Sequence, residues 1–215
     1  MAKKEDFETK VKLYFKKLKH DKTPLTVDIK DNGIKIGQLE FFNEAKLMDK
    51  ELIKNLADWR RASQWFFPSQ FKVTIAGTKS WAVNGLLNKE DRILFLVKDK
   101  NDKVVGHMGL YSFDFKKMTC EIDNVIRGLE GQPGIMTNAL NTLVEWTFAN
   151  LGISDLYLRV FSDNSKAISL YERCNFNHKN LIPLYRKEEE SGTFWEEANN
   201  GEKAERYFLK MKYVK

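Results

Sequence analysis

The sequence predicts an α/β (α+β) fold in which a mixed central β-sheet is flanked by helices. The stretch from Gly128 to Phe176 provides the main observations. Apolar residues recur at helical spacing over 136–151, directly after a loop that contains glycine and proline. Residues 155–161 then alternate like a strand, and a second apolar helical face spans 167–174. A helix that opens on such a loop presents free N–H groups to an anion, although glycine and proline are also ordinary turn residues.

Length and composition favour one soluble globular domain. A chain of 215 residues can bury a substantial core, and 42% hydrophobic with 31% charged residues is typical of such proteins. No apolar run reaches the roughly 20 residues that span a bilayer, and the start does not resemble a signal peptide. We therefore expect a cytoplasmic protein without membrane contact. Cys120 and Cys174 lie in predicted regular elements with no histidine cluster nearby, so we expect buried, reduced thiols and no metal site.

The formal net charge of +6 is compatible with an anionic partner. The lysines are scattered, and no motif typical of nucleic-acid binding accompanies them. We therefore expect no nucleic-acid partner. A solvated surface explains the charge, and a phosphate-rich cofactor or acceptor would benefit from the same positive field.

The N-terminal residues 1–33 predict a helix and hairpin extension to a main domain at 34–215. An amphipathic helix is indicated by apolar residues at helical spacing, namely Phe7, Val11, Tyr14, Phe15 and Leu18. This helix would pack on the main domain or on a second subunit, and the latter would favour a homodimer. Strands at 26–30 and 34–42 flank Asp31-Asn32-Gly33, whose residues tolerate positive φ, so we expect a hairpin.

Two helices should follow. Helical periodicity runs from Leu47 to Phe67, and a shorter helix is expected at 79–87. The first of these carries the arginine pair Arg60 and Arg61. It ends before Pro68 in an aromatic cluster made of Trp65, Phe66 and Phe67. Aromatic residues in this position more often fill a core than face a ligand.

The middle of the chain reads as consecutive strands. Segments 93–97 and 104–113 are joined by a charged turn, and Gly106 and Gly109 suggest a bulge or a close backbone approach. The next strand is expected at 118–127. Strict alternation there would direct Ile122, Asn124 and Ile126 to one face. The opposite face would hold two carboxylates and one apolar residue, namely Glu121, Asp123 and Val125.

The C-terminal part is less regular in sequence. A charged segment covers 184–190, a loop contains Gly192 and Trp195, and a closing strand is expected at 206–211. Residues 162–165 offer side chains that cap the helix whose apolar face spans 167–174.

These motifs resemble the GNAT superfamily of N-acetyltransferases. In that family a second helix often reads N-x-x-A-x-x-x-Y-x-x-x-G-F after a strand. Asn164, Ala167, Tyr171 and Phe176 match this pattern, while Asn175 stands where glycine is usual. The resemblance extends from about residue 36 to the C-terminus and implies the GNAT fold.

The cofactor loop of the same family reads Q/R-x-x-G-x-G/A. Gly134 matches its first glycine, whereas Gly131 and Met136 stand where a long polar residue and a small residue are usual. The sequence G-I-M-T at 134–137 is similar to a variant found among relatives of the ribosomal-protein N-terminal acetyltransferases. Pro133 cannot donate a hydrogen bond, so the donors after Gly134 must contribute more.

The resemblance implies acetyl-CoA as cofactor. Backbone N–H groups after the loop would hold its pyrophosphate, the backbone of the preceding strand would pair with its pantetheine arm, and Asn164 would bind cofactor or hold the strand end. The cofactor-binding residues so implied are Val125, Arg127, Gly134, Ile135, Met136, Thr137 and Asn164.

The resemblance also implies catalytic roles. Tyr171 would protonate the departing thiolate, although a tyrosine at this spacing can also be a core residue. Glu121 is the first candidate for the general base and Asp123 the second, either directly or through water. Either carboxylate could instead form structural ion pairs. His107 is a weaker candidate, because a lone histidine in a strand is more often simply packed.

For the acceptor we expect a small-molecule primary amine, attacked directly in a ternary complex. A nucleotide-linked amino sugar for surface glycan synthesis is favoured by the aromatic cluster and the basic residues. The substrate-binding candidates are Arg60, Arg61, Trp65 and Phe66. An N-terminal protein amine is the alternative acceptor, and a catalytically silent acyl-CoA-binding module is an alternative of another class.

Overall fold

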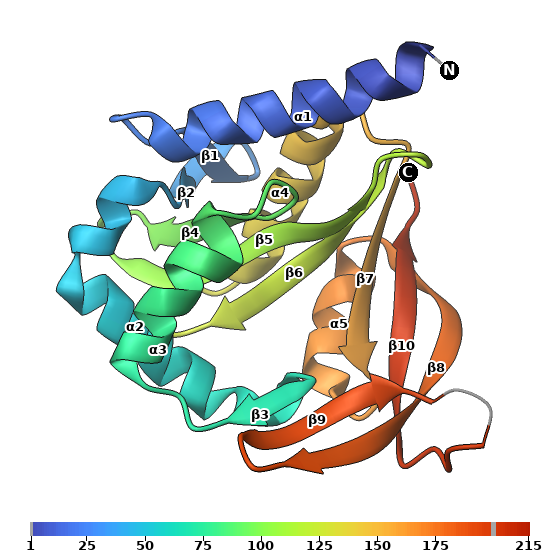
Figure 1. Cartoon of the computed structure of the whole chain (residues 1–215). Helices are drawn as coiled ribbons and strands as arrows, with labels where there is room; N and C mark the ends of the chain where they lie inside the picture. Colours follow the sequence, from blue (N-terminus) through green and yellow to red (C-terminus); the bar gives the residue numbers. More distant parts are fainter. Residues whose placement is uncertain (1, 199–200) are drawn as a thin grey trace.

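The structure is a computed structural model that describes residues 2–198 and 201–215 (Figure 1). One ten-stranded sheet, ordered β1-β2-β4-β5-β6-β7-β10-β8-β9-β3, runs through the described part of the chain. Among the described strands, only β6 and β7 pair in parallel, and the other neighbours are antiparallel. The expected mixed sheet flanked by helices is confirmed.

The elements follow one another in the expected alternation of helices and strands. In chain order they are α1 (Ala2–His20), β1 (Thr26–Asp31), β2 (Ile34–Phe41), η1 (Glu44–Met48), α2 (Lys50–Ala62), η2 (Gln64–Phe66), β3 (Ser69–Phe71), α3 (Ile75–Trp81), η3 (Ala82–Leu87), β4 (Ile93–Asp99), β5 (Val104–Asp114), β6 (Thr119–Arg127), α4 (Ile135–Leu151), β7 (Asp155–Phe161), α5 (Ser165–Arg173), β8 (Phe176–Glu189), β9 (Gly192–Glu197) and β10 (Arg206–Tyr213).

The N-terminal helix packs on the sheet rather than standing apart from it. In Figure 1, α1 lies across one end of the sheet close to α4. Its apolar positions Phe7, Val11, Phe15 and Leu18 are buried in the same core cluster as residues of β2 and α4. The hairpin after it turns through Asn32 (φ 47°) and Gly33 (φ 83°), as the sequence predicts. The division at residue 33 remains a prediction.

The expected helix at 47–67 is divided into three pieces. Asp49 caps α2 by accepting a hydrogen bond from the Leu52 N–H at 2.9 Å, and α2 ends at Ala62. The aromatic cluster falls in and after η2, where Trp65 is 59% and Phe66 47% exposed. These two rings therefore do not fill the core. The next helix begins at Ile75, earlier than expected, and continues as the π-helical η3.

The two glycines of β5 are required by close backbone contacts. A Cβ at Gly106 would lie 2.4 Å from the Ile126 carbonyl oxygen, and one at Gly109 would lie 2.2 Å from the Ile93 carbonyl oxygen. Both distances are far below a carbon–oxygen contact, so the predicted close approach is confirmed.

The expected alternation along β6 is wrong beyond Asp123. Asn124 has φ +51°, and the β5–β6 register shifts between His107 and Gly109, which together mark a β-bulge. The extra residue reverses the side-chain alternation. Val125 packs against the same cluster as Ile122, while Ile126 joins the cluster formed with α2.

The expected loop with Gly192 and Trp195 is the strand β9, and the charged segment that precedes it lies largely in β8. Strand β8 forms a hairpin with β9, and β9 pairs in turn with the short β3. Most β8 side chains are exposed, so the two-residue hydrophobic alternation of a strand is missing from the sequence. Tertiary pairing thus brings β3, which follows η2 in the chain, beside the β8–β9 hairpin.

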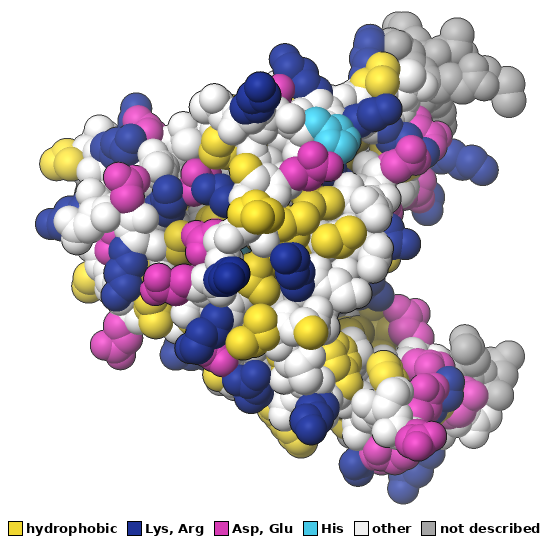
Figure 2. Space-filling model, turned by 60° about the vertical axis from the view of Figure 1, so that its left-hand side comes forward, with side chains coloured by type: hydrophobic (Ala, Val, Ile, Leu, Met, Phe, Trp, Pro, Cys, Tyr) yellow, Lys and Arg dark blue, Asp and Glu magenta, His cyan; other side chains and the backbone are white. Residues whose placement is uncertain are grey.

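The distribution of charged side chains and the state of the cysteines follow the expectations from the sequence. On the face shown in Figure 2, basic and acidic side chains are interspersed rather than segregated by sign. Cys120 and Cys174 are buried and unpaired, as expected. None of the described helices is long and apolar enough to cross a membrane.

Candidate active site

The sheet opens between β6 and β7. The parallel ladder joins Thr119–Ile122 to Asp155–Leu158 and extends no further among the described residues, although both strands continue. Figure 1 shows the two strands diverging toward their ends. The bulge at Asn124 coincides with the point where the ladder stops. Residues 125–127 therefore keep a backbone edge that does not pair with β7.

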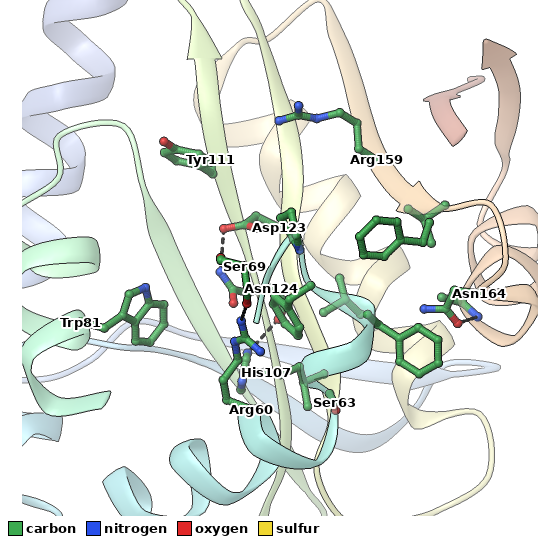
Figure 3. A pocket seen from close by; sticks show the side chains of 18 of the residues that line it. Arg60, Ser63, Ser69, Trp81, His107, Tyr111, Asp123, Asn124, Arg159 and Asn164 are labelled. Atoms are coloured by element: carbon green, nitrogen blue, oxygen red, sulfur yellow. Dashed lines mark hydrogen bonds between the residues drawn. The ribbon is translucent and has the colours of Figure 1, made fainter. Parts of the chain in front are cut away.

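A cavity of about 670 Å³ lies at this opening (Figure 3). Its walls come from α2 and the η2–β3 segment on one side and from β6, β7, α5 and β9 on the others. Elements that are far apart in sequence thus enclose one site. The predicted site residues that line it are Arg60, Phe66, Glu121, Asp123, Val125, Arg127, Asn164 and Tyr171.

Tyr171 lies on α5 and is only 8% exposed. Burial raises the pKa of its phenol well above the usual value of 10, so the hydroxyl is protonated at neutral pH and can donate a proton or a hydrogen bond. Asn164 caps the same helix, its Oδ1 accepting from the Ala167 N–H at 3.2 Å. Asn164 therefore caps the start of α5, and its role toward the cofactor remains a prediction.

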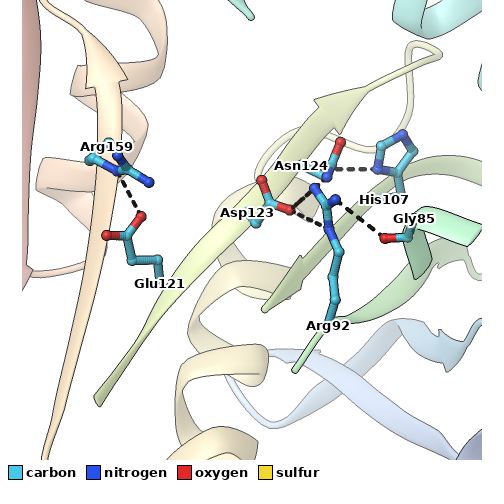
Figure 4. Close-up of polar contacts among 7 residues, drawn as sticks. All are labelled: Gly85, Arg92, His107, Glu121, Asp123, Asn124 and Arg159. Atoms are coloured by element: carbon cyan, nitrogen blue, oxygen red, sulfur yellow. Dashed lines mark hydrogen bonds and ion pairs between the residues drawn. The ribbon is translucent and has the colours of Figure 1, made fainter. Parts of the chain in front are cut away.

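The two candidate carboxylates line the cavity, and each is paired with an arginine (Figure 4). Asp123 Oδ2 accepts from Arg92 Nε at 3.0 Å and Nη2 at 2.5 Å, and from Asn124 Nδ2 at 2.7 Å. Glu121 Oε2 accepts from Arg159 Nε at 2.9 Å. Asp123 is thus the more heavily engaged of the two, and its arginine is itself anchored by a bond from Nη1 to the Gly85 carbonyl at 3.3 Å.

His107 is buried at the base of the site. Its Nδ1 lies 2.8 Å from the carbonyl oxygen of Asn124. Because a carbonyl can only accept, Nδ1 carries the hydrogen and Nε2 keeps a lone pair. Burial lowers the pKa of His107 to about 4, so the ring is neutral at pH 7. The imidazole is therefore a weak base held in one tautomer.

The four acceptor-binding candidates separate into two pairs. Arg60 and Phe66 line the cavity, whereas Arg61 and Trp65 do not. Arg61 is exposed and pairs with Asp58 at 2.7 Å. The Trp65 ring is exposed, and its carbonyl accepts from Arg206 Nη1 at 3.1 Å. The cavity is thus reached by one arginine of the pair and, within the aromatic cluster, by Phe66 and Phe67 but not by Trp65.

The predicted pyrophosphate corner lies outside the lining of this cavity. Gly134 has φ +82° and precedes the first turn of α4, whose ladder begins with the Asn138 N–H donating to the Gly134 carbonyl at 3.0 Å. The Ile135 N–H donates to the Gln132 carbonyl within the loop at 3.2 Å. This N–H was expected to bind the pyrophosphate, but here it is already engaged. Met136 and Thr137 occupy first-turn positions whose N–H groups have no intrahelical acceptor.

This corner fits a diphosphate. Gly134 is exposed, and a Cβ built there would meet only the Asn138 amide nitrogen, at 3.6 Å, within 4 Å. The start of a 17-residue helix also adds the positive end of its dipole. The roles of residues 134–137 remain predictions.

Many lining residues were not predicted from the sequence, and among them are Arg92, Arg159 and Trp195. Arg92 precedes a strand and Arg159 stands at a polar position within one, so neither pattern distinguishes them from solvated surface residues. Trp195 was noted only as part of a loop. Their roles depend on contacts between strands distant in sequence, which leave no local signal.

Known proteins agree with this architecture. Residues 39–177 match the acetyltransferase (GNAT) domain. Spermidine N(1)-acetyltransferase of Vibrio cholerae serotype O1 is 27% identical over 82 residues, which are 38% of this chain and 47% of that enzyme. The match therefore spans about half the length of that relative.

Two solved structures share the fold at low sequence identity. Spermidine N-acetyltransferase from Vibrio cholerae in complex with CoA and spermine superposes with a TM-score of 0.61 at 17% identity, covering 81% of this chain and 92% of that one. The ribosomal L7/L12 alpha-N-protein acetyltransferase RimL superposes with a TM-score of 0.63 at 10% identity, covering 89% of this chain and 94% of that one.

Proposed function

Because this chain belongs to the acetyltransferase (GNAT) domain family, whose members are acyltransferases that use acetyl-CoA, we propose that it acetylates a primary amine of a small molecule. The acceptor amine attacks directly in a ternary complex. The observation that carries this proposal is the opening between β6 and β7, where an unpaired backbone edge, a buried tyrosine and two carboxylates meet in one cavity.

Two groups of backbone atoms would hold the cofactor. First-turn N–H groups of Met136 and Thr137 bind the pyrophosphate, and the backbone of Val125 and Arg127 pairs with the pantetheine arm. Bound acetyl-CoA supplies a thioester whose acetyl group passes to the amine. Tyr171 lines the same cavity, and its hydroxyl would donate the proton that the departing sulfur requires.

A proton must also leave the acceptor. An amine with a lysine-like pKa of about 10.4 is neutral about once in 2,000 molecules at pH 7, a cost of about 4–5 kcal/mol. Glu121 is the better candidate base, because one hydrogen bond from Arg159 engages its Oε2, whereas Asp123 Oδ2 accepts three bonds. Water can relay the proton if the amine lies beyond direct reach.

For the acceptor we retain a nucleotide-linked amino sugar. Arg60 and Phe66 support it, because they offer a cation and an aromatic surface to a phosphate and a ring. An N-terminal protein amine is the alternative, and the likeness in fold to RimL favours testing it. We also retain a homodimer as an expectation, which light scattering would test.

Substitution of Tyr171 tests the enzymatic role. Tyr171→Phe keeps the ring and removes the hydroxyl, so acetyl-CoA should bind with unchanged affinity while kcat falls by about 10²-fold or more. Calorimetry and a thiol-release assay measure the two quantities. The acceptor panel contains nucleotide-linked amino sugars, N-terminal peptides and spermidine.

Two results would contradict this proposal. Turnover only with peptides would eliminate the amino sugar. Normal acetyl-CoA binding without acetylation of any amine would favour a silent acyl-CoA-binding module.

A further inference from the structure

Arg60 is a cation in the cavity wall without a counter-ion. Its Nη2 donates to the Ser69 carbonyl at 2.5 Å, and its guanidinium carbon lies 3.9 Å from the Phe67 ring centroid. No carboxylate among the described side chains forms an ion pair with it, and its buried Nη1 has no acceptor. Burial lowers the pKa of Arg60 to about 10, so it remains charged at neutral pH. A partly buried charge of this kind is costly unless a partner neutralises it.

Basic side chains outnumber acidic ones in the lining of the cavity. Among the described residues that line it, five are basic and three acidic, namely Arg60, Lys72, Arg92, Arg127 and Arg159 against Glu121, Asp123 and Glu197. Each acid is already paired, Asp123 with Arg92 and the two glutamates with Arg159. The cavity therefore offers excess positive charge and no uncommitted carboxylate.

Trp195 provides a second buried donor that has no acceptor among the described residues. The Nε1 of Trp195, on β9, is buried without an acceptor, and Trp195 also lines the cavity. In the described part of the chain, the buried unpaired side-chain atoms that belong to lining residues are thus both donors. The unmet hydrogen-bonding capacity of the described lining residues is therefore that of donors, which favours a ligand with acceptor oxygens on this wall.

We propose that the acceptor amine carries an anionic oxygen group, a phosphate or a carboxylate, which binds Arg60, and that the site disfavours polycationic amines. This inference rests on the proposed acetyltransferase function. It separates this chain from the spermidine acetyltransferases it resembles, because a polyamine would bring further positive charge to a site whose carboxylates are already neutralised.

Matched acceptors test the inference. Acetylation of glucosamine, glucosamine 6-phosphate, muramic acid and spermidine is measured at saturating acetyl-CoA. The second and third compounds add a phosphate or a carboxylate to the first, so they distinguish the two anionic groups. We expect kcat/KM at least about ten-fold higher for one of these two than for glucosamine, and lowest for spermidine.

Variants at Arg60 test whether this residue causes the preference for an anionic acceptor. Arg60→Gln should lower kcat/KM for the anionic acceptor by roughly 10- to 100-fold, with little change for glucosamine or in the KM for acetyl-CoA. Arg60→Lys retains the charge and should keep part of the preference. Lys54→Gln removes one positive charge from the exposed face of the same helix and is the matched control.

A binding measurement covers the case in which no compound of the panel is acetylated. Pyrophosphate is titrated into protein saturated with CoA, so that the cofactor corner is already filled. Wild type and Lys54→Gln should bind it at least about ten-fold more tightly than Arg60→Gln. Preference for spermidine or glucosamine overturns the proposal, as does an anionic preference that survives Arg60→Gln.

The remaining outcomes are also decisive. If no panel amine reacts and pyrophosphate binds wild type and Arg60→Gln equally, the proposal is overturned. Absence of both acetyl-CoA binding and turnover would instead refute the proposed function, and this inference would fall with it.

Discussion

Gly128 connects the end of β6 to the packing of α2. A Cβ built at this glycine lies 2.0 Å from Cδ2 and Cε2 of Trp59, a residue that is 6% exposed. An ordinary carbon–carbon contact is about 3.5–4.0 Å, so the added methyl is about 1.5–2 Å too close. The indole packs 6.2 Å from the His107 ring, and the Gly128 N–H is bonded to the Val105 carbonyl at 2.9 Å. Neither side can move without disturbing a second contact.

We therefore expect Gly128→Ala to destabilise the protein. Overpacking of this kind costs about 1–3 kcal/mol. For a chain of this size that corresponds to a fall in Tm of about 2–12 °C. Because residue 128 directly follows the strand edge assigned to the pantetheine arm, acetyl-CoA affinity should fall as well. Urea unfolding and calorimetry with acetyl-CoA measure the two effects.

Gly131→Ala is the matched control. A Cβ at Gly131 would first meet Val105 Cγ1 at 3.5 Å, which is an ordinary contact, and its φ is not positive. The same chemical change three positions later should alter stability by less than about 1 kcal/mol, in either direction. If Gly128→Ala unfolds at the same urea concentration as wild type and Gly131→Ala, the reasoning from the Trp59 contact is refuted.

Two further predictions concern buried cations. Burial lowers the pKa of Lys19 from 10.5 to about 8. Between these two pH values the unfolded chain therefore binds more protons than the folded protein, so the free energy of unfolding increases with pH. Relative to Lys19→Met, the wild-type free energy of unfolding should rise by about 3 kcal/mol across that window. Parallel stability–pH curves for the two proteins in urea would contradict this. Arg206 is 7% exposed and forms a two-bond pair with Asp163 at 2.8 and 2.9 Å, so Arg206→Lys should cost about 1–3 kcal/mol in urea unfolding. Arg186→Lys alters an exposed ion pair and should cost less than about 0.5 kcal/mol, and equal losses in both variants would refute the assignment.

The two candidate general bases show what a local sequence pattern can and cannot predict. Alternation placed Glu121 and Asp123 on one face of the strand, and both line the cavity. It could not predict their partners, because Arg92 and Arg159 come from a loop and a strand about 30 or more residues away in sequence. The acids therefore sit in ion pairs that only the folded sheet creates. Whether one of them is the base remains a prediction.

Local signals were sufficient for most of the elements themselves. Helical spacing predicts α1, α4 and α5, two-residue alternation predicts β7, and Asn32-Gly33 predicts the hairpin turn, because each pattern depends on neighbours within one or two turns of the chain. Strand β8 escaped prediction because its exposed faces carry no alternation.

The sequence by itself determined most of the helices and strands and the family motif at Asn164 and Tyr171. Tertiary structure alone decided the rest of the site. The bulge at Asn124 redirects Val125 and Ile126, and the pairing of β9 with β3 brings two walls of the cavity together. Packing also leaves Arg60 without a counter-ion among the described side chains. These features arise from register and charge contacts between distant segments, and no short window of sequence contains both partners.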